Sequence, residues 1–423
     1  MKYIASHYNL VIHENEQSIY LYNTYSGALA KLEKRVYESI NSIPFDENGI
    51  EFFEKLVSEG FVVPEQLNEF NRILLNSKKD IYGNYSSELS FVIAPTLLCN
   101  LQCIYCFEHS SCNDIMNMET GKSIVHYILS TITSDTKKVK ISWFGGEPLI
   151  AFDVIKNLSK LLKDEFKERN IEYFPSMITN GTLLTEDKCK ILVEECGIKK
   201  IQITIDGECE TYCNMKHATK EQYYRLLENI FVATKYFVVS IRLNATKDNY
   251  YELENIAEYL KKNCLNKNNL KTYIAQVVDY SNSMDNKCFS LNEFLTKKIE
   301  FDLKEIKTIS NGHLDIPKYR KNYCGALRYR NAVIGPKGEL YKCEHLIGEE
   351  DKIIGDVFNG LYYNDLYLEF LNNDFKPDCR ECILFPKCLG GCPIQRKQLK
   401  HEESCCITIE YLIACLKNEL GIK

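Results

Sequence analysis

From residue 89 onward, short apolar runs alternate with longer amphipathic stretches. The apolar runs predict six β-strands, at 89–94, 139–143, 173–179, 200–205, 238–244 and 271–278. The stretches with apolar residues at helical spacing predict helices at 119–132, 153–169, 186–195, 221–236, 250–262 and 291–306. Strands and helices that alternate in this order build parallel sheets with crossover helices, so the pattern predicts an α/β architecture.

The first 80 residues follow a different pattern. It predicts two hairpin-like strands at 8–13 and 18–22, helices at 28–40 and 52–56, and a short strand at 61–63. Gly60 ends the second of these helices, a position that favours glycine. Residues 70–86 are polar and rich in turn formers, which predicts a linker. We therefore expect a separate small α+β module at residues 1–80.

Composition and charge exclude several classes of protein. The chain has 423 residues, of which 45% are hydrophobic and 26% charged, which is ordinary for a globular protein of two or three domains. The formal net charge of −6 gives no sign of nucleic acid or a membrane surface as a partner. No apolar run is long enough for a membrane helix, and the N-terminal residues lack the apolar core of a signal peptide. These features predict a cytoplasmic protein.

The 19 cysteines are the unusual feature of the composition. Residues 1–98 contain none, whereas eight fall between Cys324 and Cys406. In a long chain without an export signal, cysteines indicate metal or redox chemistry rather than disulfides. Exposed iron–sulfur chemistry is sensitive to oxidation, so we expect a host that lives with little oxygen.

Cys99, Cys103 and Cys106 form a CxxxCxxC motif directly after the first strand of the alternating region. Three thiolates at this spacing can bind three irons of a [4Fe–4S] cluster and leave the fourth iron without a protein ligand. A cluster with such an iron can bind another molecule. The alternative is a zinc site, which His109 and Cys112 would have to complete.

This motif resembles the signature of the radical S-adenosylmethionine (SAM) superfamily, in which SAM chelates the free iron and is cleaved to a 5′-deoxyadenosyl radical. The resemblance implies a partial (β/α)6 barrel of the TIM type at residues 87–310, with the site on loops that follow the strands. Further segments resemble the family's SAM-binding motifs: Gly-Gly-Glu after the second strand, Asn180 after the third, Thr204-Ile-Asp206-Gly after the fourth, and Arg242-Leu-Asn244 on the fifth. The resemblance implies that SAM is contacted by Tyr105, Gly145, Gly146, Glu147, Asn180, Thr204, Asp206, Arg242 and Asn244. Each segment alone would be an ordinary turn or strand end.

The cysteines at the C-terminal end resemble the SPASM extension of this superfamily, which holds two auxiliary [4Fe–4S] clusters, and imply such a domain at residues 311–423. The resemblance assigns Cys324, Cys343 and Cys392 to auxiliary cluster I, and Cys379, Cys382, Cys388 and a final cysteine to auxiliary cluster II. The final cysteine is Cys405 or Cys406, and Cys406 is favoured because a helical pattern at 408–416 begins just beyond it. The chain lacks one further cysteine of the sulfatase maturases, so a peptide cysteine, His345, Cys288 or another distant cysteine could complete auxiliary cluster I.

The resemblance as a whole implies a peptide-modifying enzyme with three [4Fe–4S] clusters and SAM. Residues 1–80 resemble the winged-helix domain that binds the leader of a precursor peptide as an added strand. The expected product is a thioether, formed on a cysteine-containing peptide of ribosomal origin, with a flavodoxin- or ferredoxin-type protein as reductant. Glu344, next to Cys343, is the candidate general base.

Three alternatives remain open from the sequence. A carbon–carbon crosslinking maturase fits the same motifs, and a sulfatase maturase that forms formylglycine fits most of them. An iron–sulfur or zinc scaffold that binds a peptide without catalysis is the third. A scaffold would have no use for the Gly-Gly-Glu and Thr-Ile-Asp segments.

Overall fold

The structure is a computed structural model that describes residues 2–42, 52–83, 87–108, 114–279, 284, 286–308, 314–398 and 404–422. It divides into two compact units. The first unit contains residues 1–82, 290–324 and 373–423, and the second contains residues 83–289 and 325–372. The three domains expected from the sequence stay a prediction, because these units join segments that are distant in the chain.

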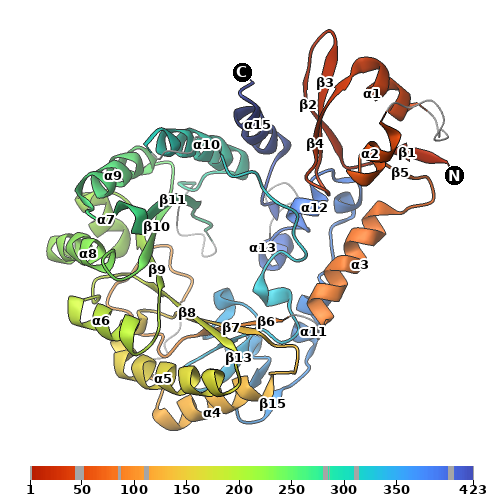
Figure 1. The fold of residues 1–423 in the computed structure, drawn as a ribbon. Coiled ribbons are helices and arrows are strands. Elements are labelled where there is room, and N and C mark those ends of the chain that lie inside the picture. The colour runs from red at the N-terminus through yellow and green to blue at the C-terminus, as the bar shows by residue number, and fades with distance from the viewer. Residues whose placement is uncertain are drawn as a thin grey trace. The chain divides into compact units, whose positions relative to one another are not determined.

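The second unit is built on one sheet with six consecutive parallel strands (Figure 1). These strands lie side by side in chain order: β6 (Glu88–Ile93), β7 (Lys138–Trp143), β8 (Glu172–Thr179), β9 (Lys200–Ile205), β10 (Val238–Ala245) and β11 (Leu270–Gln276). Their apolar side chains are buried on alternate positions, as in the register Phe91↔Ile141 and Ile203↔Ile241. The predicted α/β class is confirmed.

Helices connect these strands and cover the outer face of the curved sheet in Figure 1. They are α4 (Met118–Ser130), α5 (Phe152–Glu168), α6 (Glu186–Glu194), α7 (Cys209–Lys216), α8 (Lys220–Ala233) and α9 (Tyr250–Asn263). Side-chain caps fix several starts: Asn117 accepts from the Thr120 amide, and Thr219 and Gln222 form a capping box at α8. Helix α7 was not predicted, because its eight residues carry only a weak amphipathic pattern.

Short strands after residue 331 extend this sheet beyond β6. Strand β12 (Ala332–Ile334) pairs in parallel with β6, and β13 (Glu339–Tyr341), β14 (Gly355–Asp356) and β15 (Gly360–Leu361) follow in antiparallel order. Helix α11 (Asp365–Asn372) ends this part of the unit. The segment around Cys343 therefore belongs to the same sheet as the CxxxCxxC loop.

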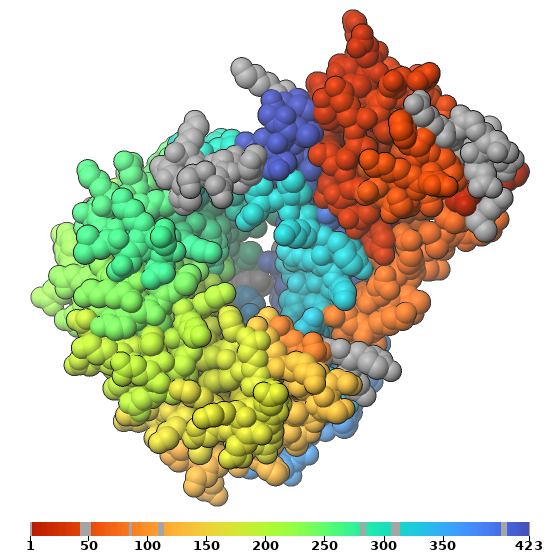
Figure 2. Space-filling view, in the orientation of Figure 1, coloured from red at the N-terminus to blue at the C-terminus, as the bar shows by residue number. Residues whose placement is uncertain are grey.

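The first unit begins with two small sheets, one of β1 (Tyr3–Ala5) with β5 (Val62–Pro64), and one of β2 (Asn9–Glu14), β3 (Ser18–Asn23) and β4 (Leu29–Glu33). Helices α1 (Lys34–Asn41), α2 (Phe53–Ser58) and α3 (Glu69–Tyr82) follow. The later segments of this unit add α10 (Leu291–Thr308), α12 (Phe385–Cys388), α13 (Pro393–Gln398) and α15 (Ile409–Leu420). Helix α15, dark blue in Figure 2, lies against β2, in red.

Two expectations for the N-terminal residues were wrong. Residues 28–40 are not one helix, because Leu29–Glu33 pairs with β3 as strand β4 and the helix begins only at Lys34. Residues 70–86 are not a linker, since residues up to Tyr82 form helix α3. The buried residues of α3, among them Ile73, Ser77 and Ile81, recur every fourth position, and such a sparse apolar face is easily read as a polar loop. The winged-helix interpretation itself stays a prediction.

No helix in the described ranges combines the length and the apolar character needed to cross a lipid bilayer.

Candidate active site

The CxxxCxxC loop follows β6 and is fixed by backbone hydrogen bonds to the end of α7. The Gln102 amide donates to the Lys216 carbonyl at 3.1 Å, and the Ile104 amide donates to the Met215 carbonyl at 2.9 Å. These bonds hold the loop at the carboxyl ends of the parallel strands, the edge where the sites of such barrels lie. Burial raises the pKa of Cys99 and of Cys106 to about 11 each, so their thiolates would need a cation as partner.

The glycine pair after β7 packs directly on the chain that enters this loop. A Cβ at Gly145 would lie 2.2 Å from the Thr96 carbonyl oxygen, and one at Gly146 would lie 2.4 Å from the Leu98 carbonyl oxygen. The φ angle of Gly145 is +111°, a value that favours glycine. Both positions therefore need glycine for close backbone packing, and this packing places the cysteine loop.

Glu147 is fully buried and braces the ends of two strands. Its carboxylate accepts hydrogen bonds from the Thr179 hydroxyl at 2.8 and 2.9 Å, from the Asn180 amide at 2.8 Å and from the Leu149 amide at 2.9 Å. Burial raises the pKa of Glu147, and the bonds from Leu149, Asn180 and Thr179 oppose this. Because its oxygens are already engaged, Glu147 acts in this structure as a support for the loops rather than as an open acceptor.

Asn180 connects the loop after β8 to the first cysteine. Its side-chain amide donates to the Asn100 side chain at 2.8 Å and lies 3.8 Å from the Cys99 sulfur. Asn100 in turn donates to the Thr182 hydroxyl at 2.8 Å. The predicted site residue Asn180 thus lies at the cysteine loop, and Asn100, which was not predicted, orients it.

A buried polar network fills the space between Cys103 and strands β9 and β10. The Tyr105 hydroxyl donates to Asp206 Oδ2 at 2.5 Å and accepts from Lys216 Nζ and from the Asn244 amide, both at 2.9 Å. Lys216 Nζ is 3.3 Å from Asp206 Oδ2 and 3.8 Å from the Cys103 sulfur. The structure therefore brings together four predicted residues, Cys103, Tyr105, Asp206 and Asn244, and one that the sequence did not single out, Lys216.

The groups of this network shift one another's pKa values. Burial lowers the pKa of Lys216, but the interactions with Asp206, Tyr105 and Cys103 outweigh burial and raise it well above its usual range. Burial and the charge of Asp206 raise the pKa of Tyr105, so its hydroxyl keeps its proton. Asp206 Oδ1 is buried and has no hydrogen-bond partner within the described ranges, which leaves one acceptor for a ligand that carries a donor.

The remaining predicted residues of the barrel lie beside this network. Arg242 and Thr204 are neighbours in the register of β10 and β9, and Arg242 Nε donates to the Asn244 side chain at 2.9 Å. Asn249, which was not predicted, donates to the Asp206 carbonyl at 2.6 Å and to the Asn244 carbonyl at 2.9 Å. It fixes the two strand ends that carry the network.

Glu344 lies in a short turn of the same unit, Glu344–Leu346, directly after Cys343. The ring of the next residue, His345, is 4.1 Å from the ring of Phe107, which follows the third cysteine of the loop. The positive charge of Arg242 is among the groups that lower the pKa of His345, after its burial. The candidate base Glu344 is therefore on a turn next to the CxxxCxxC loop.

Cys288, a candidate ligand from the sequence, packs near Tyr105 in a cluster with Met215, Val277 and Met284. His109 and Cys112, which the zinc alternative requires, lie outside the described residues. Within the described ranges, no three His, Cys, Asp or Glu side chains are close enough to bind a single metal ion.

In the first unit, Cys388 is the centre of a second group of thiols. The thiols of Cys405 and Cys406 both donate to its sulfur, which lowers the pKa of Cys388 to about 3. Cys405 also faces the charges of Cys382 and Cys379, whereas Cys406 faces Arg320.

Glycine again permits the close approach of two segments. A Cβ at Gly391 would lie 2.2 Å from the Ser404 carbonyl oxygen. The chain that carries the last two cysteines therefore packs directly on Gly391, which stands between Cys388 and Cys392 in the sequence. Burial raises the pKa of Tyr323, and the charges of Cys406, Cys392 and Cys324 raise it further. The charge of Cys406 thus acts on Tyr323, and the charges of Cys379 and Cys382 act on Cys405.

Comparison with known proteins places these features in a family. Residues 93–260 match the sequence profile described as the radical SAM superfamily. The cysteine-type anaerobic sulfatase-maturating enzyme of Clostridium novyi (strain NT) is 26% identical over 340 residues, which is 72% of this chain and 87% of that protein.

Two solved structures share the fold. Native anSMEcpe with bound AdoMet and Cp18Cys peptide has a TM-score of 0.58 and 20% identity, and the match covers 79% of this chain and 96% of that one. Streptococcus suis SuiB bound to precursor peptide SuiA has a TM-score of 0.53 and 18% identity, and the match covers 98% and 100% of the two chains. With its CxxxCxxC loop at the head of six parallel strands, this chain contains a radical SAM domain, matched over residues 93–260, and is an enzyme.

Proposed function

We propose that the enzyme modifies a cysteine-containing precursor peptide and forms a thioether within it. The observation that carries the SAM chemistry is the buried Lys216, whose Nζ lies 3.8 Å from the Cys103 sulfur while it bonds Tyr105 and Asp206. A fixed positive charge beside the cysteine loop suits a ligand with a carboxylate, which is the group that SAM presents to the cluster in this family. The open acceptor on Asp206 suits a donor of the same ligand.

On this proposal, Cys99, Cys103 and Cys106 hold the cluster, and the predicted barrel residues surround SAM. Bound there, SAM supplies the 5′-deoxyadenosyl radical that removes a hydrogen atom from the peptide. Gly145, Gly146 and Glu147 shape the loop. Tyr105, Asn180, Thr204, Asp206, Arg242 and Asn244 provide the polar contacts, together with Lys216.

The C-terminal cysteines are proposed to hold the two auxiliary clusters. For auxiliary cluster II, Cys406 is the proposed fourth ligand beside Cys379, Cys382 and Cys388, and Cys405 is the alternative. For auxiliary cluster I, Cys324, Cys343 and Cys392 leave one iron for a thiolate of the peptide. An electron released when the thioether forms would pass to these clusters.

Glu344 is the proposed base for the peptide thiol, because its turn lies beside the cysteine loop. The single electron that SAM cleavage needs would come from a flavodoxin- or ferredoxin-type protein in the cytoplasm. The peptide loses one hydrogen atom to the radical, one proton to the base and one electron to an auxiliary cluster, which balances the bond that forms.

Strand β4 is the proposed binding edge for the peptide leader. It pairs with β3 on one side, and no described strand pairs with its other side. Hydrogen bonds join Asn23 to Ala28 and Lys34 to Gln17 at the two ends of the pair, so the ladder uses every second residue and the amides of Leu29, Lys31 and Glu33 point away from β3. A peptide strand could add to these groups.

Lys31→Pro should weaken leader binding by roughly tenfold or more, because proline removes one outward amide without breaking the β3 ladder. Lys31→Ala is the matched control, since it removes the same side chain and keeps the amide. The measurement is the dissociation constant of a labelled leader peptide by fluorescence anisotropy. Equal affinity of the two variants would show that the leader binds elsewhere.

A sulfatase maturase is the second candidate, because the C. novyi relative carries that name and shares 26% identity over most of its length. The match to SuiB covers 98% of this chain against 79% for anSMEcpe, which favours a peptide maturase with an additional module. A carbon–carbon crosslinking maturase has the same residues at its disposal.

One experiment separates these functions. The protein, reconstituted anaerobically with iron and sulfide and then reduced, is incubated with SAM and the cysteine-containing peptide encoded beside its gene. We expect 5′-deoxyadenosine and a peptide that has lost two hydrogens and one alkylatable thiol. A product that keeps its thiol would indicate a carbon–carbon bond, conversion of cysteine to an aldehyde would indicate formylglycine, and absence of 5′-deoxyadenosine would exclude the enzyme proposal.

A further inference from the structure

Residues of the N-terminal module and the cysteine segment near residue 380 share one hydrophobic core. Tyr8 and Ile73 pack in it with Cys379, Phe385 and Leu389, and Cys382 packs against its surface. The Phe70 and Phe385 rings are 4.8 Å apart. The first residues of the chain therefore form part of the wall around two of the proposed ligands of auxiliary cluster II.

Two hydrogen bonds attach this wall to the chain on both sides of Cys382. The His7 ring nitrogen Nε2 lies 3.2 Å from the Glu381 carbonyl oxygen, and the Thr24 hydroxyl donates to the Ile383 carbonyl at 2.6 Å. Each N-terminal residue thus binds the carbonyl group of a residue that flanks the cysteine, Glu381 before it and Ile383 after it. The chain around Cys382 is held against the N-terminal residues.

Tyr8 lies in the chain between these attachments and is fully buried. Its hydroxyl has no hydrogen-bond partner within the described ranges. A buried hydroxyl without a partner destabilises the folded state, so a phenylalanine would be the better residue here if the space stayed apolar. The unpartnered hydroxyl therefore indicates that Tyr8 donates to an acceptor that forms only in the assembled enzyme.

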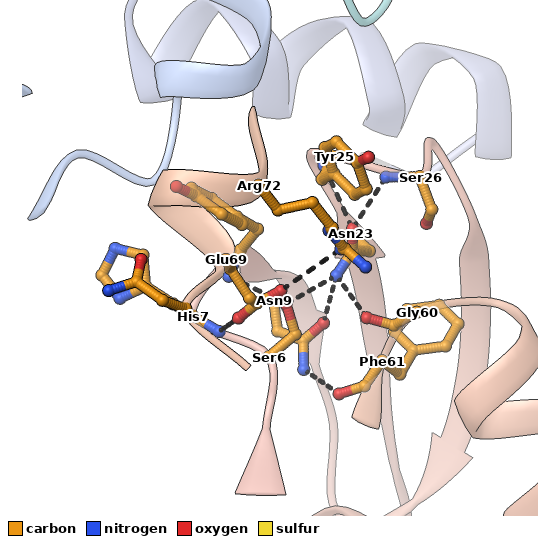
Figure 3. A network of polar contacts seen from close by, with 12 residues as sticks. Ser6, His7, Asn9, Asn23, Tyr25, Ser26, Gly60, Phe61, Glu69 and Arg72 are labelled. Atoms are coloured by element: carbon orange, nitrogen blue, oxygen red, sulfur yellow. Dashed lines mark hydrogen bonds and ion pairs between the residues drawn. The ribbon is translucent and has the colours of Figure 1, made fainter. Parts of the chain in front are cut away.

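A network of polar contacts fixes the backbone at Ser6 and His7 (Figure 3), directly before Tyr8 in the chain. Glu69 of α3 accepts from the Ser6 hydroxyl at 2.7 Å and from the His7 amide at 2.8 Å, and the Tyr8 amide donates to the Ser6 hydroxyl at 3.2 Å. Asn23 donates to the same hydroxyl at 3.1 Å. Because these bonds fix the backbone from Ser6 to Tyr8, the Tyr8 ring has little freedom to turn its hydroxyl elsewhere.

Cys382 packs against the core that contains Tyr8, and several charged groups act on the Tyr8 hydroxyl. Burial raises its pKa, the charges of Glu69, Cys382 and Glu381 raise it further, and Arg72 opposes them. Glu69 is already bonded to Ser6 and His7, and Arg72 lies over the Tyr25 ring at 4.4 Å. Of the acceptors nearby, the Cys382 sulfur is the one that changes when a cluster is bound, because it then becomes a thiolate.

We infer that the Tyr8 hydroxyl donates a hydrogen bond to the Cys382 thiolate when auxiliary cluster II is bound, so that the N-terminal module supplies an outer-shell ligand that tunes this cluster. The inference rests on the proposed function, which assigns Cys382 to that cluster. A donor to a cluster thiolate stabilises the reduced, more negative state and raises the reduction potential. Tyr8 is thus a positioning residue that links the module proposed to bind the leader to an electron acceptor.

The test uses the fully reconstituted enzyme with Tyr8→Phe, which removes only the hydroxyl. At the potential where auxiliary cluster II of the wild type is half reduced, we expect the ratio of reduced to oxidised cluster to fall about fivefold, the factor for one hydrogen bond of ordinary net strength. The readouts are a redox titration followed by electron paramagnetic resonance, and an exchangeable proton coupling in pulsed spectra that Tyr8→Phe removes. The signal of this cluster is the one that Cys379→Ala abolishes.

Tyr37→Phe is the matched control, because Tyr37 packs in the other core of the same module, around Leu21, Ile40 and Leu56. It should leave both the potential and the exchangeable coupling unchanged. A full iron content with no change in ratio and coupling for Tyr8→Phe would overturn the inference alone. A wild-type protein that holds only about four irons would overturn the auxiliary clusters, and the inference with them.

Discussion

Replacing Cys99, Cys103 and Cys106 together by alanine should abolish the formation of 5′-deoxyadenosine and leave about eight of the twelve irons expected for three clusters. The loop would keep its backbone bonds to Met215 and Lys216, so the barrel should still fold. Iron and sulfide analysis after anaerobic reconstitution, with chromatography of the SAM products, gives both numbers.

The matched control removes three other thiols, those of Cys189, Cys196 and Cys264. These are buried in the core of the same unit and belong to no proposed site. This variant should lose some stability through small cavities and keep its iron and its SAM cleavage. If the CxxxCxxC variant cleaved SAM as fast as this control, the loop would not be the SAM site. If its iron fell to nearly zero, the C-terminal cysteines would not hold clusters of their own.

The fold followed from the sequence because its main signal is repeated. Six apolar runs with a helix between each pair leave few arrangements other than consecutive parallel strands, and small errors at the ends of elements do not change the order. The N-terminal module gave weaker signals. Residues 29–33 carry leucines at positions that also suit a helix, and only their pairing with β3 decides for a strand.

The sequence predicted those residues of the candidate site that belong to recognisable motifs. Cys99, Gly145 and Asn180 stand next to strand ends, and parallel strands bring their carboxyl ends to one edge, so their meeting at the cysteine loop follows from the order of elements. The role of Glu147 did not follow. Its burial and its bonds to Thr179 and Asn180 depend on how two loops pack, and no local sequence pattern predicts that packing.

Lys216 and Tyr8 show what the sequence could not reveal. A lysine in the last turn of a helix is common, because its charge complements the helix dipole. The sequence pattern therefore does not distinguish Lys216 from an exposed residue. Tyr8 reads as one more apolar residue at the start of a strand. The fold makes both unusual. Each is almost fully buried, and each packs near a proposed cluster ligand that is distant from it in the sequence.

Lys216→Met should reduce the rate of 5′-deoxyadenosine formation by roughly 100-fold and raise the dissociation constant for SAM, because hydrogen bonds between charged groups are worth about 1.5–3 kcal/mol. The substitution also leaves Asp206 as a buried charge without its cation, which should destabilise the protein by about 3–5 kcal/mol. Activity and stability would then fall for two different reasons. Lys216→Arg, which keeps the charge, should retain part of the activity.

The double variant Lys216→Met with Asp206→Asn separates these reasons. It removes both charges of the pair, so the free energy of unfolding should recover much of the loss, whereas SAM binding and cleavage should stay low because no cation faces the ligand. The measurements are thermal unfolding of the reconstituted enzymes, equilibrium binding of SAM and the rate of its cleavage. Recovery of cleavage together with stability would show that Lys216 serves only to neutralise Asp206, and the SAM carboxylate would then need another partner, for which Arg242 is the nearest predicted cation on β10.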